Sequence, residues 1–163
     1  NLYRRTLELA QLNPDDEVYD LYTGLGSIAL LAAKHCKKVV GIELVEAAIE
    51  DARKNASLNN ITNCAFYAGD MAKIFTETFI EENGRANVVI TDPPRAGMHK
   101  DVCDQLLQLA PEKIVYVSCN PVTQARDIQL LINDYAVTVL QPFDQFPQTY
   151  HVECIALLER RKA

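Results

Sequence analysis

Short apolar runs alternate with amphipathic segments along almost the whole chain. Five runs rich in β-branched and aromatic residues predict buried strands, at residues 17–22, 38–43, 64–68, 87–91 and 114–117. Six segments with apolar positions at helical spacing predict helices, at residues 3–12, 27–35, 45–59, 71–82, 100–109 and 123–133. Strands that alternate with helices of about ten residues are typical of βαβ units, so the pattern predicts a mostly parallel sheet.

The pattern changes near the end of the chain. Strands are predicted at residues 137–140 and 151–158, and the turn-prone Phe146-Pro147-Gln148 leaves little room for a crossover helix between them. Because parallel neighbours need a long crossover, we expect an antiparallel hairpin at one edge. The complete pattern predicts an α/β fold: a seven-stranded, mostly parallel sheet with one antiparallel edge strand and helices on both faces. It resembles the Rossmann-like fold of S-adenosylmethionine-dependent methyltransferases.

Composition places the chain among ordinary soluble globular proteins. Hydrophobic residues make up 48% of the 163 residues and charged residues 23%. There is no apolar run of about 20 residues and no linker-like tract, so residues 1–163 are predicted to form one domain without a membrane segment. Five dispersed cysteines, without CxxC or zinc-like spacing, predict reduced thiols, a cytoplasmic protein and no metal site.

Acidic residues follow three successive predicted strands. Residues 20–26 (Asp-Leu-Tyr-Thr-Gly-Leu-Gly) place a glycine turn between a strand and a helix that Ser27 is predicted to cap. Asp20 suits a cationic ligand better than a pyrophosphate. Glu43 is placed to accept hydrogen bonds from two ribose hydroxyls, and Asp70 from an adenine amino group. Each acid could instead stabilise a helix start, but three at one sheet edge favour a shared nucleoside cofactor.

A cysteine follows the fifth predicted strand, in Ser118-Cys119-Asn120-Pro121. A thiol at the edge where a parallel sheet meets its ligand crevice can act as a carbon-directed nucleophile once it is ionised. The alternative is a small apolar side chain that fills space, because free cysteines are often buried.

Two further segments carry candidate chemistry. Asp92-Pro93-Pro94-Arg95 is a stiff loop, because each proline fixes φ and removes a donor; the alternative is a rigid surface turn. Related loops of amino-group methyltransferases have an aromatic residue where this chain has Arg95, which disfavours amino methylation. Glu153 is a candidate proton acceptor on the same strand face as His151. The alternative is a solvated Glu153 and a packed His151.

Together these segments resemble the RNA uracil-5-methyltransferases that act on tRNA and ribosomal RNA. The resemblance rests on residues 20–26, on 92–97 (Asp-Pro-Pro-Arg-Ala-Gly), on 115–121 (Val-Tyr-Val-Ser-Cys-Asn-Pro), and on Phe146-Pro147 followed by His151-Val152-Glu153. It covers nearly the whole chain, in order. It implies transfer of a methyl group from S-adenosylmethionine to carbon 5 of a uridine, through a covalent cysteine–uracil intermediate.

The resemblance also implies roles for individual residues. Cys119 would be the nucleophile, Glu153 the base that removes the carbon-5 proton, and Asp92 a further member of the catalytic pocket. The residues that would hold the cofactor are Asp20, Tyr22, Gly24, Gly26, Glu43, Asp70 and Asp92.

The sequence departs from the family in what it lacks. Members carry an N-terminal OB-like RNA-binding domain, and many carry a cysteine-ligated iron–sulfur cluster; neither is present, so the chain looks like a catalytic-domain fragment. With a net charge of −6, it is expected to be a monomer that binds its tRNA or ribosomal RNA substrate weakly by itself. Two alternatives stay open: amino-group methylation of a base or protein, and a cofactor-binding scaffold without catalysis.

Overall fold

The computed structural model describes residues 2–145, 147–149 and 152–162. Its strands are β1 (Glu17–Leu21), β2 (Lys38–Glu43), β3 (Cys64–Ala68), β4 (Val88–Thr91), β5 (Lys113–Ser118), β6 (Tyr135–Phe143) and β7 (Glu153–Arg160). Its helices are α1 (Leu2–Ala10), α2 (Ser27–Ala32), α3 (Glu46–Leu58), α4 (Met71–Ile74), α5 (Glu77–Asn83), α6 (Lys100–Leu109) and α7 (Pro121–Leu131).

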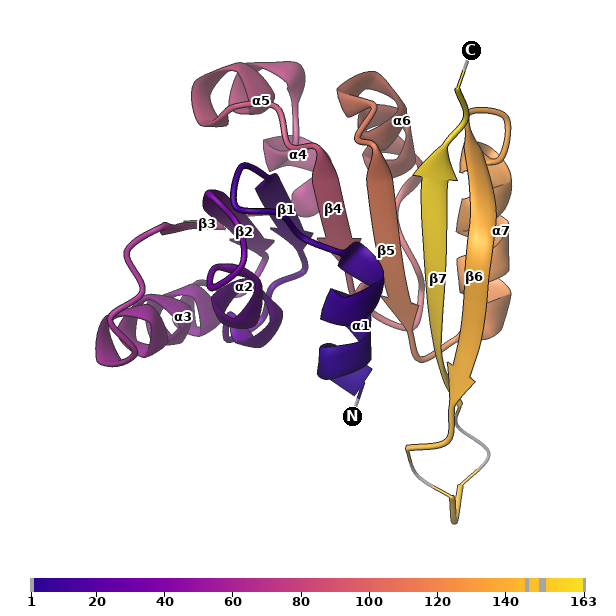
Figure 1. Ribbon diagram of the computed structural model, residues 1–163, viewed down its shortest axis with the longest axis horizontal. Coiled ribbons are helices and arrows are strands. Elements are labelled where there is room, and N and C mark those ends of the chain that lie inside the picture. The colour runs from indigo at the N-terminus through magenta and orange to yellow at the C-terminus, as the bar shows by residue number, and fades with distance from the viewer. Residues whose placement is uncertain (1, 146, 150–151, 163) are drawn as a thin grey trace.

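The strands form one sheet in the order β3-β2-β1-β4-β5-β7-β6 (Figure 1). The first five strands in this order pair in parallel, and β7 pairs antiparallel with both β5 and β6. The seven-stranded, mostly parallel sheet and the terminal hairpin are therefore confirmed. The reversed strand is not at the edge, however, because β7 lies between β5 and the edge strand β6. Chain order alone does not reveal which arm of a hairpin pairs with the rest of the sheet.

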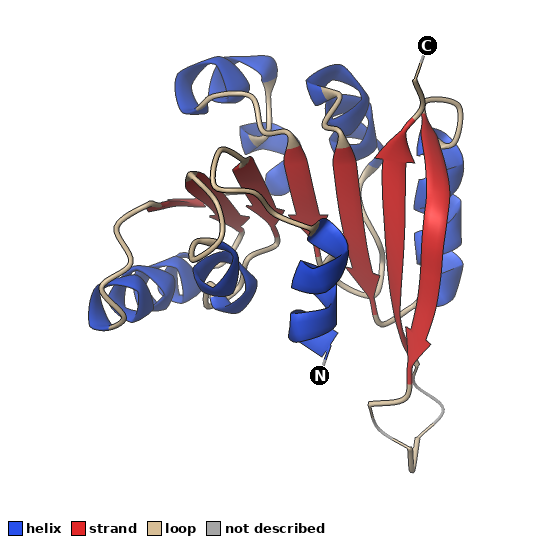
Figure 2. Cartoon of the chain, in the orientation of Figure 1, coloured by secondary structure: helices blue, strands red, loops and turns tan. Residues whose placement is uncertain are grey.

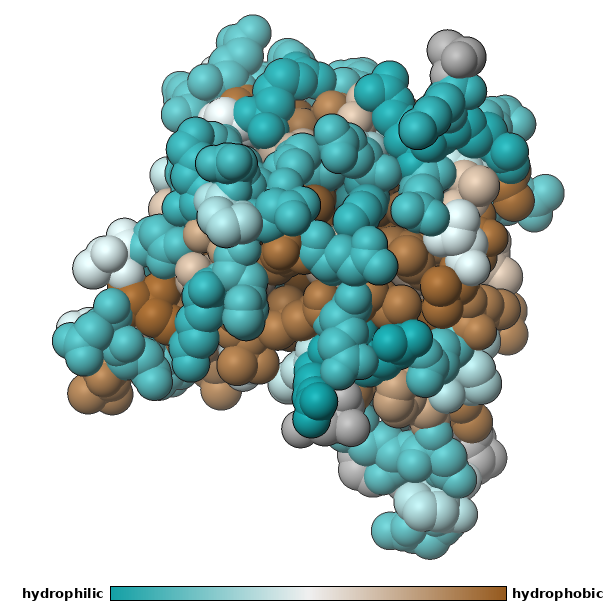
Figure 3. All heavy atoms as spheres, viewed as in Figure 1, coloured by the Kyte–Doolittle hydropathy of each residue, from teal (hydrophilic) through white to brown (hydrophobic). Residues whose placement is uncertain are grey.

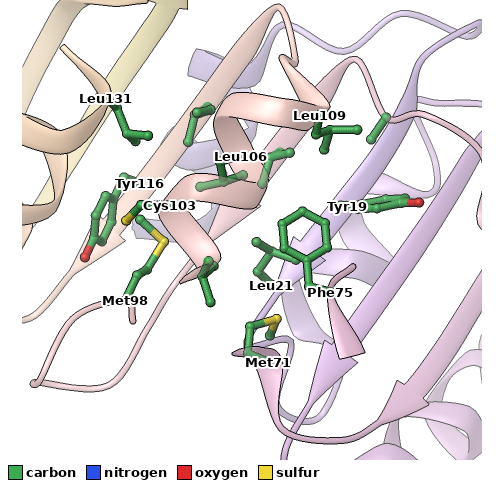
Figure 4. Close-up of a cluster of buried hydrophobic side chains, with 14 of the residues drawn as sticks. Tyr19, Leu21, Met71, Phe75, Met98, Cys103, Leu106, Leu109, Tyr116 and Leu131 are labelled. Carbon is green, nitrogen blue, oxygen red and sulfur yellow. The ribbon is translucent and has the colours of Figure 1, made fainter. Parts of the chain in front are cut away.

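Helices cover both faces of the sheet and enclose two apolar cores (Figure 2). Helices α1, α2 and α3 bury one core, and α4 to α7 bury the other (Figure 4). Successive strand residues point to opposite faces, so Val18 belongs to the first core and Tyr19 to the second. Both faces of the central strands are buried, which explains their nearly continuous apolar sequences.

The face viewed in Figure 3 carries a band of apolar side chains across its middle, beside α1, while polar side chains cover its upper part. Within the described residues, no helix combines the length and the apolar character that crossing a membrane requires.

Two helix predictions are wrong. The helix expected over residues 71–82 is two short helices, because Thr76 Oγ1 accepts a hydrogen bond from Phe79 N (3.3 Å) and starts α5. The buried Phe75 lies between them. Ser27 does not cap α2; Gly26 occupies the cap position, and it has no side chain that could accept a hydrogen bond.

Several element boundaries also differ from the predicted ones, most clearly at α7, β6 and β7. Helix α7 begins at Pro121, two residues before the predicted start, and Asn120 caps it. Strand β6 extends over nine residues and passes a bulge between Val137 and Val139. Strand β7 begins at Glu153, while His151 lies outside the described residues.

Candidate active site

The predicted site residues gather at one edge of the sheet. The parallel strands β1 to β5 all end there, and the reversed strand β7 begins there, since Ser118 at the end of β5 pairs with Cys154 (Figure 1). Cys119 and Glu153 are the next residues beyond that pair. They therefore lie at the same end of the neighbouring strands β5 and β7. Strand order reverses between β1 and β4, which is where open α/β sheets place their ligands.

A cleft of about 1080 Å³ opens at this switch point, between α4, the loop after β4 and α7. Its lining includes four predicted residues: Tyr22, Glu43, Asp70 and Asp92. Cys119 and Glu153 are not among the lining residues; they lie beyond the cleft, on the β5–β7 side.

Asp20 is buried beneath the glycine turn, with 1% of its surface exposed. Its Oδ2 accepts hydrogen bonds from Thr23 Oγ1 (2.5 Å) and Ala29 N (3.1 Å). Its Oδ1 is buried without a hydrogen-bond partner among the described residues. Burial raises the pKa of Asp20 to about 7, and the negative charges of Asp92 and Glu43 add to that rise. A cationic ligand beside Oδ1 would satisfy this oxygen and favour the ionised carboxylate.

Glu43 connects the glycine turn to the end of β2. Its Oε2 accepts a hydrogen bond from Gly24 N (3.1 Å), and its Oε1 accepts one from Val45 N (3.1 Å). Gly24 has a φ of +54°, and a Cβ at that position would meet no atom within 4 Å. The turn thus presents bare backbone to open space beside a fixed carboxylate, which fits the close approach of a ribose.

The other predicted cofactor residues have mixed surroundings. Asp70 is exposed and caps α4, because its Oδ1 accepts a hydrogen bond from Ala72 N (3.1 Å). Burial raises the pKa of the half-buried Tyr22 hydroxyl. A Cβ at Gly26 would lie 3.1 Å from the Ala52 side chain, so this glycine permits helix packing. Asp70 therefore stabilises the start of α4 as well as lining the cleft, and its second carboxylate oxygen lies 3.5 Å from Lys73 Nζ.

Three carboxylates and one tyrosine form an electrostatic cluster between the cleft and β7. Burial, followed by the charge of Glu153, raises the pKa of Asp92 to about 6. Burial also raises the pKa of Tyr3, and the charges of Asp92, Asp20 and Glu153 contribute. Tyr3 comes from the first turn of α1, and nothing in its sequence surroundings singles it out as a site residue.

Cys119 is half-buried in a tightly bonded turn between β5 and α7. Ser118 Oγ accepts a hydrogen bond from Asn120 N (3.0 Å), and Asn120 caps the helix by accepting one from Val122 N (3.2 Å). Asn120 Nδ2 and Thr123 Oγ1 both donate to Arg95 O, each at 3.1 Å. These bonds join the cysteine turn to the Pro-Pro loop. A side chain that only fills space is usually fully buried, and Cys119 is not.

An unpredicted residue, Asp127, holds the Pro-Pro loop against α7. It is 1% exposed, and its Oδ2 accepts hydrogen bonds from Met98 N and Tyr116 Oη, each at 2.7 Å. Arg126 neutralises its Oδ1 at 2.6 Å and donates to Ala96 O at 2.9 Å. Tyr116 and Met98 meet at one end of the core in Figure 4.

The hydrogen bonds that Asp127 and Arg126 form with the Pro-Pro loop require a glycine after Ala96. Gly97 has a φ of +79°, and a Cβ there would lie 2.5 Å from Asp127 Oδ2 and 2.7 Å from an Arg126 nitrogen. Only glycine combines this backbone conformation with so close an approach. Arg126 had offered no signal in the sequence beyond a surface position, and its role is to hold this loop.

Three residues of the terminal motif, Phe146, Tyr150 and His151, lie outside the described residues. Within the described part of the chain, no group of three or more His, Cys, Asp or Glu side chains is arranged to hold a metal ion.

The chain is similar to known RNA methyltransferases. Residues 4–161 match the tRNA (uracil-5-)-methyltransferase family. RNA methyltransferases of Bacteroides thetaiotaomicron and Porphyromonas gingivalis, both described as uncharacterized, are 55% and 57% identical over 161 residues. These alignments cover 99% and 98% of this chain, but 36% and 35% of the relatives.

A solved structure is similar throughout the fold. The tRNA (uracil-54, C5)-methyltransferase of Pyrococcus abyssi, in complex with S-adenosyl-L-homocysteine, superimposes with a TM-score of 0.81 and 35% identity. The match covers 95% of this chain and 37% of that one. The chain thus spans about a third of the length of these proteins. It belongs to the tRNA (uracil-5-)-methyltransferase family.

Proposed function

We propose that this member of the family transfers a methyl group from S-adenosylmethionine to carbon 5 of a uridine in tRNA or ribosomal RNA. The observation that carries the proposal is the joint placement of Cys119, Asp92 and Glu153 at the sheet edge where the cofactor cleft opens. The family match and the similarity to a tRNA uracil-C5 enzyme support the choice of reaction.

The cofactor is proposed to lie across the ends of β1, β2 and β3. Asp20 would hold the cationic amino group through Oδ1, which has no hydrogen-bond partner among the described residues, and Glu43 would accept hydrogen bonds from the ribose hydroxyls beside Gly24. Tyr22, Asp70 and Asp92 line the same cleft, and Gly26 lets α2 pack closely beneath it. When bound, the cofactor supplies an electrophilic methyl group.

Cys119 then activates the uracil ring, whose carbon 5 is a poor nucleophile. After the thiol has lost its proton to solvent, the thiolate adds to carbon 6 and leaves an enolate with electron density at carbon 5. Carbon 5 forms a bond to the methyl group, and the carbon–sulfur bond of the sulfonium breaks. Glu153 removes the carbon-5 proton, the double bond re-forms, and the electron pair returns to the Cys119 sulfur.

Asp92 has a proposed place in this pocket because it adjoins both the cleft and Glu153. Its raised pKa means that it carries a proton more readily than a surface aspartate does. A protonated Asp92 donates a hydrogen bond and lessens the charge repulsion that an ionised Glu153 would meet.

Residues 1–163 are further proposed to be the catalytic domain of a longer enzyme whose other parts bind most of the RNA. The net charge of −6 supports this division, because RNA affinity depends strongly on cationic side chains that neutralise phosphates. The chain is proposed to act as a monomer in the cytoplasm.

The test follows the fate of carbon 5. The full-length protein is incubated with S-adenosylmethionine and RNA that carries tritium at carbon 5 of its uridines. We expect one tritium released for each methyl group transferred, and mass spectrometry of the digested RNA should identify 5-methyluridine. Methylation of an amino group, without tritium release, would instead establish the amino-methylation alternative.

A further inference from the structure

Cys119 and Glu153, two of the residues with proposed chemical roles, are positioned by different strands. Cys119 follows β5, and Glu153 begins β7, which runs in the opposite direction. Their separation therefore depends on how firmly the open ends of these two strands are joined. The last pair of the ladder is Ser118 with Cys154, so both residues lie just past the final rung.

A buried glutamine links β5 and β7 in addition to the hydrogen bonds that the two strands form with each other. Gln124, on the first turns of α7, is only 2% exposed. Its Nε2 donates to Tyr116 O on β5 at 2.9 Å and to Cys154 O on β7 at 3.2 Å. Both acceptors are carbonyl oxygens, so only the amide nitrogen can face them, and it uses both of its hydrogens.

We infer that Gln124 is a positioning residue that sets the distance between Cys119 and Glu153. One of its acceptors belongs to the residue bonded to Glu153, and the other lies three residues before Cys119. Helix α7 lies behind the β6–β7 hairpin (Figure 1). The Gln124 side chain therefore reaches β5 and β7 from the same face of the sheet. This inference rests on the proposed function.

Loss of this link displaces Glu153 more than Cys119. The cysteine turn has bonds of its own, because Asn120 and Thr123 both donate to Arg95 O and Asn120 caps α7. Glu153 is the first residue of its strand, where β7 pairs with Phe143 of the edge strand β6, and the bond from Gln124, which ties β7 to β5, is formed at the very next residue. Weaker positioning of Glu153 should slow removal of the carbon-5 proton, so more enzyme should wait as the covalent intermediate.

The test compares Gln124→Leu and Gln124→Met with Gln129→Leu in the full-length protein. Both replacements at 124 keep the volume and remove the two donated hydrogens. Gln129 is the same residue type on the same helix, but exposed. Turnover is measured at a temperature well below the melting midpoint of every variant. Cofactor affinity is measured by calorimetry, and the covalently bound fraction on ordinary uridine RNA by denaturing gel.

Both variants at 124 should lower kcat at least about fivefold, since misplacing a reacting group by an ångström can cost far more. The covalent fraction should rise relative to Gln129→Leu, and cofactor affinity should stay unchanged. A smaller fall in kcat, an equal fall in cofactor affinity, or a fall without more covalent complex would each overturn the inference. If the wild-type enzyme transfers no methyl group to carbon 5, the proposed function itself has failed, whatever the variants do.

Discussion

The two halves of the sheet edge are organised in different ways. On the β1–β3 side, groups close in the sequence orient two carboxylates: Asp20 accepts hydrogen bonds from the Thr23 hydroxyl and Ala29 N, and Asp70 accepts one from the helix that it precedes. On the β4–β7 side, the loops are held by side chains that reach from α7 across long sequence separations. The comparison teaches that Asp20 and Asp70 are oriented by residues near them in the sequence, whereas the loops of the proposed chemical half depend on one helix.

The largest effect on turnover should come from replacing Cys119. Cys119→Ala is expected to lower turnover by about a thousandfold or more, because the uracil ring then has no nucleophile to activate it. Binding of S-adenosylmethionine, measured by calorimetry, should be unchanged, since Cys119 is not among the proposed cofactor contacts and does not line the cleft. Cys64→Ala, on β3, is the matched control and should retain turnover. Substantial activity in Cys119→Ala would favour amino methylation instead.

The next prediction concerns Asp127, through which α7 holds the Pro-Pro loop. Asp127→Asn should lower the free energy of unfolding by about 2 kcal/mol, because an amide cannot accept hydrogen bonds on both sides, and either Arg126 or the buried Met98 N and Tyr116 Oη donors lose their acceptor. Urea denaturation measures this change. Asp104→Asn on α6, whose exposed pair with Lys100 contributes little, should change stability by less than about 0.5 kcal/mol. Equal effects of the two substitutions would show that α7 does not hold the chemical half.

A smaller effect is expected in the cofactor half. Glu43→Gln should weaken S-adenosylmethionine about tenfold, because an amide cannot accept from both Gly24 N and Val45 N and loses the charge that favours ribose hydroxyls. Calorimetry gives the affinity, and the melting midpoint should move little. Unchanged affinity would contradict the proposed ribose contact. A fall in kcat at saturating cofactor would show that the two halves are not separable.

The last prediction is a pH dependence of stability. The pKa of Asp20 is about 7 in the folded protein, whereas an aspartate in the unfolded chain ionises near 4. Between these values the folded state binds more protons, so the free energy of unfolding should fall as pH rises from about 4 to 7.

Asp20→Asn cannot ionise at this position, and its stability should fall less steeply over the same pH range. Thermal unfolding without cofactor compares the two proteins directly, and parallel curves would mean that Asp20 does not carry this proton. Saturating S-adenosylmethionine should reduce the slope of the wild-type protein, because its amino group favours the ionised carboxylate.

The sequence predicted most of the β1–β3 side of the site and less of the β4–β7 side. Apolar periodicity located each strand, since buried parallel strands read as continuous apolar runs, and the acids at their ends were visible as residues that follow those runs. The break before α5 was missed, because Thr76 competes with an otherwise continuous helical pattern. The place of β7 was also missed, since no local signal specifies the partner of a hairpin.

The contacts of α7 could not have been predicted from the sequence. Gln124 and Asp127 look like ordinary polar positions on a helix until the fold brings β5, β7 and the Pro-Pro loop against them. Tyr3 reaches the carboxylate cluster only because α1 packs over the sheet. Each of these contacts joins segments that are far apart in the chain, and such pairings leave no periodic pattern.

The covalent intermediate is tested most directly by trapping it. The full-length enzyme is incubated with S-adenosylmethionine and RNA that contains 5-fluorouridine, whose carbon 5 offers no proton for Glu153 to remove. We predict a stable protein–RNA adduct that contains the transferred methyl group, and peptide mapping should place the bond at Cys119. An enzyme that methylates ordinary uridine RNA at carbon 5 but forms no such adduct, or forms it at another residue, would contradict the account.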